Sequence, residues 1–303
     1  MSTTLLSEPI RVRRQPAAVG PMRVKTRSGW WFLAPMVAVN ALVVIGPCVA
    51  TVVYSFTNWT GAGPVHFVGL SNYEALVTSA EFRSALVHNL EWTAVFLTVP
   101  VALGLLAAFA IDQVPWGKRF FRTAYFVPYI ISPVVNAALW SQIYADHFGI
   151  SALHSISPLG DPTLALWSVA FTNVWAWWGF LAVIFHSAMQ GIPKERYEAA
   201  ELDGAGVLAR AKHISLPGIR PTVVFMLLMT VIWSMVVFTY VFIMTSGGPA
   251  GASQVVATLL YQDAFASQQV GLAAAMGVVL LLVAAVISGA YVLANRKGRL
   301  DVG

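Results

Sequence analysis

Six long apolar segments, separated by shorter polar stretches, run along this chain of 303 residues. A helix needs about 20 apolar residues to cross the hydrocarbon core of a bilayer, and each segment is long enough. Only helices and closed barrels satisfy their backbone in lipid, and these runs are too long and too continuously apolar for barrel strands. The pattern therefore predicts an all-α integral membrane protein. Its six transmembrane helices are expected at 30–56, 88–111, 120–145, 165–190, 219–245 and 271–294.

The composition agrees with a membrane protein and narrows the classes of partner. Hydrophobic residues make up 58% of the chain and charged residues only 10%, whereas soluble domains carry about 25% charged residues. The net charge of +5 by itself would suggest a nucleic-acid partner. Once the charged residues are placed on the predicted topology, they instead indicate the orientation of the protein in the membrane. We therefore expect contact with a lipid membrane and none with nucleic acid. The single cysteine, Cys48, excludes an intrachain disulfide and does not indicate a redox compartment.

The basic residues predict the orientation of the helices. If the amino terminus is inside, all 18 Lys and Arg residues except Arg83 lie in or beside the inner segments. Positive charge marks the cytoplasmic side of a membrane protein. Both termini are therefore expected in the cytoplasm. The outer loops are expected at 57–87, 146–164 and 246–270, and they are rich in Gly, Pro, Ser and aromatic residues.

The chain is expected to consist of a basic cytoplasmic tail at 1–29 and one six-span domain at 30–303. The tail either is a solvated topogenic segment or touches anionic lipid. The first apolar run is too long for a signal peptide and lacks a cleavage pattern after it, so it is interpreted as an uncleaved span. Trp30, Trp31 and Trp59 suit the aromatic belts at the membrane interfaces.

A charged insert between the fourth and fifth apolar segments has the pattern of a short helix at about 193–205. Pro193 suits the first turn of a helix, where its missing N–H costs nothing. Lys194 and Glu198 form an i,i+4 pair, and Gly204 can take a positive φ and end the helix. An ordinary amphipathic loop helix would share these features.

The full pattern of the insert is more specific than its composition. It resembles the cytoplasmic coupling segment of bacterial ABC-importer permeases. The residues that carry the resemblance are Glu198-Ala199-Ala200, Asp203-Gly204-Ala205, Ile214, Leu216-Pro217 and Pro221.

The resemblance implies that this helix sits in a cleft of an ATP-binding subunit and passes its closing motion to the membrane helices. Glu198 is then expected to provide a contact or to anchor the helix, and Gly204 to form the turn. Leu208 and Ala211 stand where the family often has Trp and usually has a bulky aromatic residue, so details of the docking are expected to differ. The implied coupling residues are Glu198, Ala199, Ala200, Asp203, Gly204, Leu216 and Pro217.

Further motifs resemble the carbohydrate-uptake branch of these permeases, and the first permease of its maltose and glycerol-phosphate type pairs in particular. They are Ser55-Phe56 with Trp59, Phe67 to Tyr73, Arg122, Pro128, Trp140 and Gly247-Gly248-Pro249. His88-Asn89 stands where Asn-Thr is usual. The resemblance implies the type I importer permease fold in a bacterial inner membrane, with the insert between spans four and five.

The chain contains no G-x-x-x-x-G-K-[ST] phosphate-binding loop. Gly117-Lys118-Arg119 lacks both the upstream glycine and the Ser or Thr. We therefore expect a subunit that is not an enzyme and binds no cofactor itself, with ATP and Mg bound by a partner. The resemblance implies a second permease as heterodimer partner, two ATP-binding subunits and an extracytoplasmic solute-binding protein.

Polar residues inside the spans are the candidates for a substrate path, because polar groups at membrane depth are costly and often functional. Rings can cover the apolar faces of a polyhydroxylated ligand while amides meet its hydroxyls, although each ring could instead pack between helices. The predicted path residues are Asn136, Trp140, Asn173, Trp177, Trp233 and Tyr240. Glu91 is expected at the outer interface rather than in proton transfer. His186 is expected to be a hydrogen-bonded packing residue rather than a proton relay or ligand.

Two other classes remain as alternatives. An ion-coupled secondary transporter would need an embedded carboxylate, an inverted repeat and broken helices at mid-depth, and Glu91 is a poor candidate for such a carboxylate. A membrane enzyme would need a catalytic cluster, and no set of residues has catalytic or metal-ligand spacing. The substrate stays open among sugars, sugar alcohols, trehalose-like disaccharides and glycerophosphodiesters.

Overall fold

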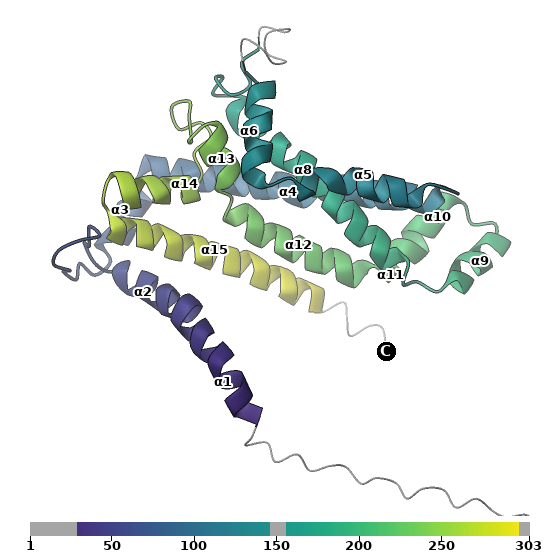
Figure 1. Ribbon diagram of the computed structural model, residues 1–303, viewed down its shortest axis with the longest axis horizontal. Helices are drawn as coiled ribbons and strands as arrows, with labels where there is room; N and C mark the ends of the chain where they lie inside the picture. Colours follow the sequence, from purple (N-terminus) through teal and green to yellow (C-terminus); the bar gives the residue numbers. More distant parts are fainter. Residues whose placement is uncertain (1–28, 146–155, 297–303) are drawn as a thin grey trace, which may run out of the picture. The chain divides into compact units, whose positions relative to one another are not determined.

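The computed structural model describes residues 29–145 and 156–296 (Figure 1). Apart from one isolated antiparallel bridge between Thr57 and Phe67, these residues form helices and loops. The helices up to the 146–155 gap are α1 (Gly29–Asn40), the π-helical turn η1 (Ala41–Ile45), α2 (Gly46–Tyr54), α3 (Ser71–Thr78), α4 (Ala80–Gln113), α5 (Lys118–Ile130) and α6 (Pro133–Ile143). Those after it are α8 (Ala165–Met189), α9 (Lys194–Leu202), α10 (Val207–Arg210), η2 (Ala211–Ser215), α11 (Leu216–Gly218), α12 (Arg220–Met235), α13 (Thr239–Met244), α14 (Val256–Tyr261), η3 (Gln262–Ala266) and α15 (Val270–Arg296).

The chain divides into two compact units, Met1–Cys48 and Val49–Gly303, which we describe separately. The described part of the first unit comprises α1, η1 and the beginning of α2. These turns follow one another without a break and contain Pro35 inside α1. The helical segment Phe32–Tyr54, which continues past the unit boundary, is long and apolar enough to cross a membrane, as predicted.

In the second unit, four helical segments are long and apolar enough to cross a membrane. They are Ala80–Gln113, Ala165–Met189, Arg220–Met244 and Val270–Leu293. With Phe32–Tyr54 the described residues contain five such segments, or six if the bent pair α5 and α6 counts as one span. The predicted all-α membrane fold is confirmed, and every predicted span coincides with helix.

The predicted third span, 120–145, is not one straight helix. It consists of α5 and α6, which meet at an angle of 90° (Figure 1). Ile131 and Ser132 have extended backbone angles between them. Pro133 explains the break, because proline lacks the N–H that a continuing helix needs and forces the preceding residue out of the α region.

The core of the second unit lies around α8, which packs against α4, α5, α12 and α13. The α4–α8 contact is very close. A Cβ atom at Gly104 would lie 2.8 Å from the Leu181 Cβ and 3.2 Å from the Ala182 backbone nitrogen. Small residues let helix backbones approach in this way, and van der Waals packing then holds membrane helices together.

Asn89 on α4 joins three helices inside this unit. Its side-chain nitrogen donates to the Met235 carbonyl at the end of α12 (3.1 Å), and its oxygen accepts from the Val256 N–H at the start of α14 (2.8 Å). Both partners are helix-end groups without an intrahelical partner. Nearby, Thr93 and Ser234 share a hydrogen bond of 2.9 Å. Asn89 therefore stabilises the interruption between α12 and α13 within the fifth span.

Candidate coupling segment and substrate path

The predicted helix at 193–205 is present as α9, Lys194–Leu202. Pro193 precedes it as the N-cap, and Gly204 follows it with φ of +76°. The Ala205 N–H donates to the Ala200 carbonyl (2.8 Å) and the Gly204 N–H to the Glu201 carbonyl (3.0 Å), which is the bonding of a helix that ends in a left-handed residue. An added Cβ at Gly204 would meet no atom within 4 Å, so backbone conformation rather than space favours glycine there.

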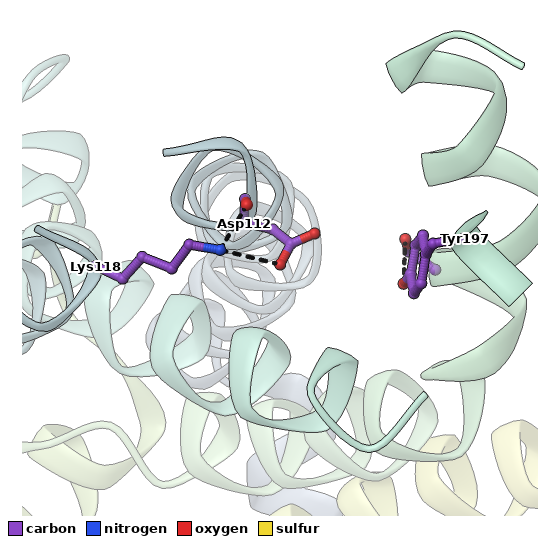
Figure 2. A network of polar contacts seen from close by, with 4 residues as sticks. Asp112, Lys118 and Tyr197 are labelled. Carbon is purple, nitrogen blue, oxygen red and sulfur yellow. Dashed lines mark hydrogen bonds and ion pairs between the residues drawn. The ribbon is translucent and has the colours of Figure 1, made fainter. Parts of the chain in front are cut away.

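The chain then turns back through α10, η2 and α11 towards the fifth span. Three nested contacts join the outgoing and returning arms of this 192–218 segment. At the base, a Cβ at Gly218 would lie 2.6 Å from the Ile192 Cδ1. In the middle, the Tyr197 and Ser215 hydroxyls share a hydrogen bond of 2.9 Å (Figure 2).

At the tip, the Arg210 guanidinium forms an ion pair with the Glu201 carboxylate. Such exposed pairs are individually weak, but this pair adds to the two contacts below it. Ser215 is buried, so its hydroxyl needs the Tyr197 partner. Together these three contacts hold the two arms of the segment against each other as one structural unit.

The 192–218 segment also faces the end of α4 across a cavity of about 220 Å³. Its lining residues are Phe109, Asp112, Gln113, Tyr197, Glu201, Val207, Arg210, Ala211 and Ser215. The Lys118 ammonium holds Asp112 in place, at 2.8 Å from its carbonyl oxygen and 3.8 Å from its carboxylate Oδ1. Figure 2 shows this pair and Tyr197 facing each other across an interval. The segment thus meets the membrane helices at a small, partly polar space.

The predicted coupling residues lie mainly on the surface of this segment. Ala200 is half-buried. The exposed ones are Glu198, Ala199, Asp203, Gly204, Leu216 and Pro217. Two apolar side chains at the tip are also open to solvent, with Leu202 90% and Leu208 83% exposed. Exposed apolar groups on an otherwise polar segment are typical of a surface that meets another protein.

Four of the six predicted path residues form two contacting pairs. The Asn136 side-chain nitrogen on α6 donates to the Tyr240 hydroxyl on α13 (3.1 Å), and both residues are buried. Trp177 on α8 and Trp233 on α12 meet edge-to-face, with ring centroids 4.5 Å apart. The first pair links α6 to α13, and the second pair links α8 to α12.

The remaining two path candidates each lie one helical turn from a member of these pairs, because Trp140 is four residues from Asn136 on α6 and Asn173 is four residues from Trp177 on α8. Trp140 on α6 packs edge-to-face against Trp175 of α8, with centroids 5.5 Å apart. Asn173 is half-buried on α8. Two buried polar atoms of the set have no hydrogen-bond partner among the described residues, namely Asn136 Oδ1 and Trp177 Nε1.

Two expectations about ionisable residues have different outcomes. Glu91 is exposed in the first half of α4, and its place at the outer interface stays a prediction. His186 is buried, with 1% of its surface exposed, but neither ring nitrogen has a hydrogen-bond partner among the described residues. The expected hydrogen bond of His186 is therefore wrong, while its packing position agrees. Within 29–145 and 156–296, no group of three or more His, Cys, Asp or Glu side chains is placed to hold a metal ion.

Sequence reasoning missed the residues that hold the 192–218 segment together. Tyr197 and Ser215 are 18 positions apart, and Glu201 and Arg210 are nine apart. Neither separation corresponds to neighbours on one helix. The sequence signal that relates to these pairs is Gly204, which was predicted to end the helix and after which the chain turns back.

The architecture defines a polytopic helical membrane protein with a polar helical segment that projects between two spans. Comparison with known proteins identifies its kind: residues 100–299 match the family described as "Binding-protein-dependent transport system inner membrane component", and the chain belongs to that family.

Curated relatives of similar length support this assignment. The probable ABC transporter permease protein YurN of Bacillus subtilis is 34% identical over 269 residues, which cover 85% of this chain and 92% of that protein. The diacetylchitobiose uptake permease NgcF of Streptomyces coelicolor is 32% identical over 287 residues, covering 88% and 81%. The resemblance to ABC-importer permeases is thereby confirmed, and relatives named for sugar uptake support the carbohydrate branch.

A solved structure has the same fold. A bacterial ABC transporter involved in the import of the acidic polysaccharide alginate aligns with a TM-score of 0.77 at 22% identity, covering 91% of this chain and 98% of its own. As a permease subunit in the membrane, this chain is not an enzyme, and ATP hydrolysis belongs to separate ATPase subunits.

Proposed function

We propose that this chain forms half of the translocation path of an ATP-driven importer for a sugar or a glycerol-phosphate-type solute such as a glycerophosphodiester. The family match carries the importer assignment. Relatives named for starch degradation products and arabinooligosaccharides favour a sugar over the glycerol-phosphate alternative. The partners are a second permease, two ATP-binding subunits that bind ATP and Mg, and an extracytoplasmic solute-binding protein.

The 192–218 segment, which we name the coupling segment, is proposed to transmit the motion of an ATP-binding subunit. Its tip offers the exposed Leu202 and Leu208 beside the exposed carboxylates of Glu198 and Asp203. A docking surface with apolar side chains at its centre and charges at its rim is a common design of protein interfaces. The coupling residues are Glu198, Ala199, Ala200, Asp203, Gly204, Leu216 and Pro217.

Transmission requires that force on the tip reach the membrane helices instead of bending the segment. The Tyr197–Ser215 hydrogen bond and the Ile192–Gly218 contact tie the arms together. Because α8 leads into the segment and α12 leaves it, movement of one body shifts both helices. A nucleotide can drive this change only if the ATPase dimer binds it more tightly in one state than in the other.

The substrate path is proposed to run past Asn136, Trp140, Asn173, Trp177, Trp233 and Tyr240. Asn136 Oδ1 is a buried acceptor and Trp177 Nε1 a buried donor, both without a protein partner among the described residues. Buried polar atoms of this kind call for an explanation such as water or a ligand. A sugar hydroxyl can donate to the first and accept from the second, while the rings cover its C–H faces.

The orientation follows from the distribution of charge. On the six-span topology predicted from the sequence, all Lys and Arg residues except Arg83 fall in segments on the side of the coupling segment, and such residues mark the cytoplasmic side. We therefore place both termini and the coupling segment in the cytoplasm of this multi-pass inner-membrane protein.

The test is substrate-stimulated ATPase activity of the reconstituted importer. The Glu198→Ala and Gly204→Asp variants are compared with wild type and with Glu195→Ala, an exposed carboxylate on the same helix, with assembly checked by copurification. We expect both test variants to lose most of the stimulation or to lose the ATPase subunit, and Glu195→Ala to retain both. If both test variants behave as wild type and uptake proceeds without an ATPase, the proposal is wrong and ion coupling becomes the better account.

A further inference from the structure

A basic site lies at the start of α5, outside both the coupling segment and the path. Three cations, Lys118, Arg119 and Arg122, begin this helix. Lys118 is engaged by Asp112, 3.8 Å from its carboxylate. Arg122 donates one hydrogen bond to the uncharged Ser187 hydroxyl (3.2 Å). Within 29–145 and 156–296, neither arginine forms an ion pair with a carboxylate, so two positive charges are uncompensated.

The two arginines line a cavity of about 330 Å³ between α5 and α8. Its other lining residues are Thr123, Phe126 and Val183. Arg119, Arg122 and Phe126 follow one another at intervals of three and four residues, so they lie on one face of α5 in this order. The cavity is thus cationic at the helix start and apolar one to two turns further along.

Neighbouring side chains place the cationic end at the level of lipid headgroups. Trp116 and Phe120 are exposed, by 82% and 70%, on either side of Lys118. Exposed aromatic rings are typical of the interfacial belt of a membrane protein, and arginines near helix ends extend to the same level. Arg122 contacts Ser187, which precedes the coupling segment by a few residues, so this is the end of the bundle that carries that segment (Figure 1).

We propose that Arg119 and Arg122 bind the phosphate of an anionic phospholipid, with its glycerol backbone and first acyl carbons against Phe126 and Val183. Guanidinium groups bind phosphate through charge-assisted hydrogen bonds, and basic pockets between membrane helices bind anionic headgroups. A zwitterionic lipid carries the same phosphate but adds an ammonium group beside the two guanidinium groups, so its net charge compensates neither arginine. A free phosphate matches the cationic end but leaves the apolar end empty. The site does not depend on the function of the coupling segment.

The experiment measures lipid retention by the intact importer complex. The complex is exchanged into detergent with equal phosphatidylglycerol and phosphatidylethanolamine, and bound lipids are counted by native mass spectrometry. We expect wild type to prefer phosphatidylglycerol, and Arg119→Gln/Arg122→Gln to lose this preference by about thirtyfold. Lys118→Gln removes a charge that Asp112 already compensates, so it is expected to change the preference little.

Three results would overturn the proposal. One is an unchanged preference in the double glutamine variant. Another is inorganic phosphate displacing the lipid at equal concentration, which would make the site one for free anions. The third is loss of a partner subunit instead of lipid, which would make the pocket a protein interface. Should the double variant fail to fold, Arg119→Lys/Arg122→Lys, which keeps both charges, must retain most of the preference.

Discussion

The α4–α8 contact and the coupling segment are rigid for different reasons. Gly104 brings the α4 backbone against Leu181 and Ala182, both fully buried, so close packing holds these helices together. In the coupling segment, Ser215 is the buried residue, and contacts such as Tyr197–Ser215 hold its two arms. The difference indicates that the α4–α8 contact contributes to global stability, whereas the coupling segment can lose rigidity while the fold survives.

The largest expected effect comes from Gly104→Leu. The added side chain would meet Leu181 within the close α4–α8 contact, and overpacking of this kind costs about 1–3 kcal/mol. We expect a clearly lower midpoint of thermal unfolding in detergent, with the ratio of substrate-stimulated to basal ATPase activity retained by the molecules that fold. Gly289→Leu on α15, where an added Cβ meets nothing within 4 Å, should leave the midpoint close to wild type. Equal losses in both variants would contradict the packing argument.

Tyr197→Phe should change coupling to the ATPase rather than thermal stability, which is the opposite of what we expect for Gly104→Leu. It removes the hydroxyl that bonds to Ser215, a loss of about 0.5–1.5 kcal/mol that is confined to the segment. We expect the stimulated-to-basal ATPase ratio to fall while the thermal midpoint changes little. Tyr125→Phe is the matched control, because the Tyr125 hydroxyl makes no hydrogen bond within the described residues. A falling midpoint with an unchanged ATPase ratio would show that Tyr197 acts only in stability.

The smallest effect concerns Asp263 in the outer turn η3. Burial raises the pKa of this carboxyl above its ordinary value, the Ser267 hydroxyl opposes the rise, and the Glu81 carboxylate adds to it. The folded state therefore holds this proton at a pH where the unfolded state has released it, so stability falls as pH rises through that window. Asp263→Asn should flatten this slope at pH values above about 4, the ordinary pKa of an aspartate, in thermal unfolding scans. A slope equal to that of wild type would rule out this group as its source.

The sequence predicted what depends on local signals. Apolar run length located the spans, and Gly204 located the end of α9, because a left-handed helix end depends on one residue. Pro133 carried a local signal for the 90° break, but the continuous apolar run concealed it.

Other features depend on contacts between distant parts of the chain. Asn136 and Tyr240 are 104 positions apart, and their pairing follows from how α6 and α13 pack. The lack of a partner at His186 likewise depends on which side chains surround it, and a single sequence does not specify them. The path candidates were therefore selected by residue type, while the pairing of four of them across helices emerged only from the fold.

The most direct test of the central claim is site-directed cross-linking from the tip of the coupling segment. In a Cys48→Ser background, Leu202→Cys is labelled with a short reagent that carries a maleimide and a photoreactive group, and the assembled importer is irradiated. Glu91→Cys, exposed in the first half of α4, serves as the control. The account predicts a cross-link from position 202 to the ATP-binding subunit, changed in yield by ATP, and none from position 91. An intact, active complex that gives no cross-link from position 202 in any nucleotide state would contradict it.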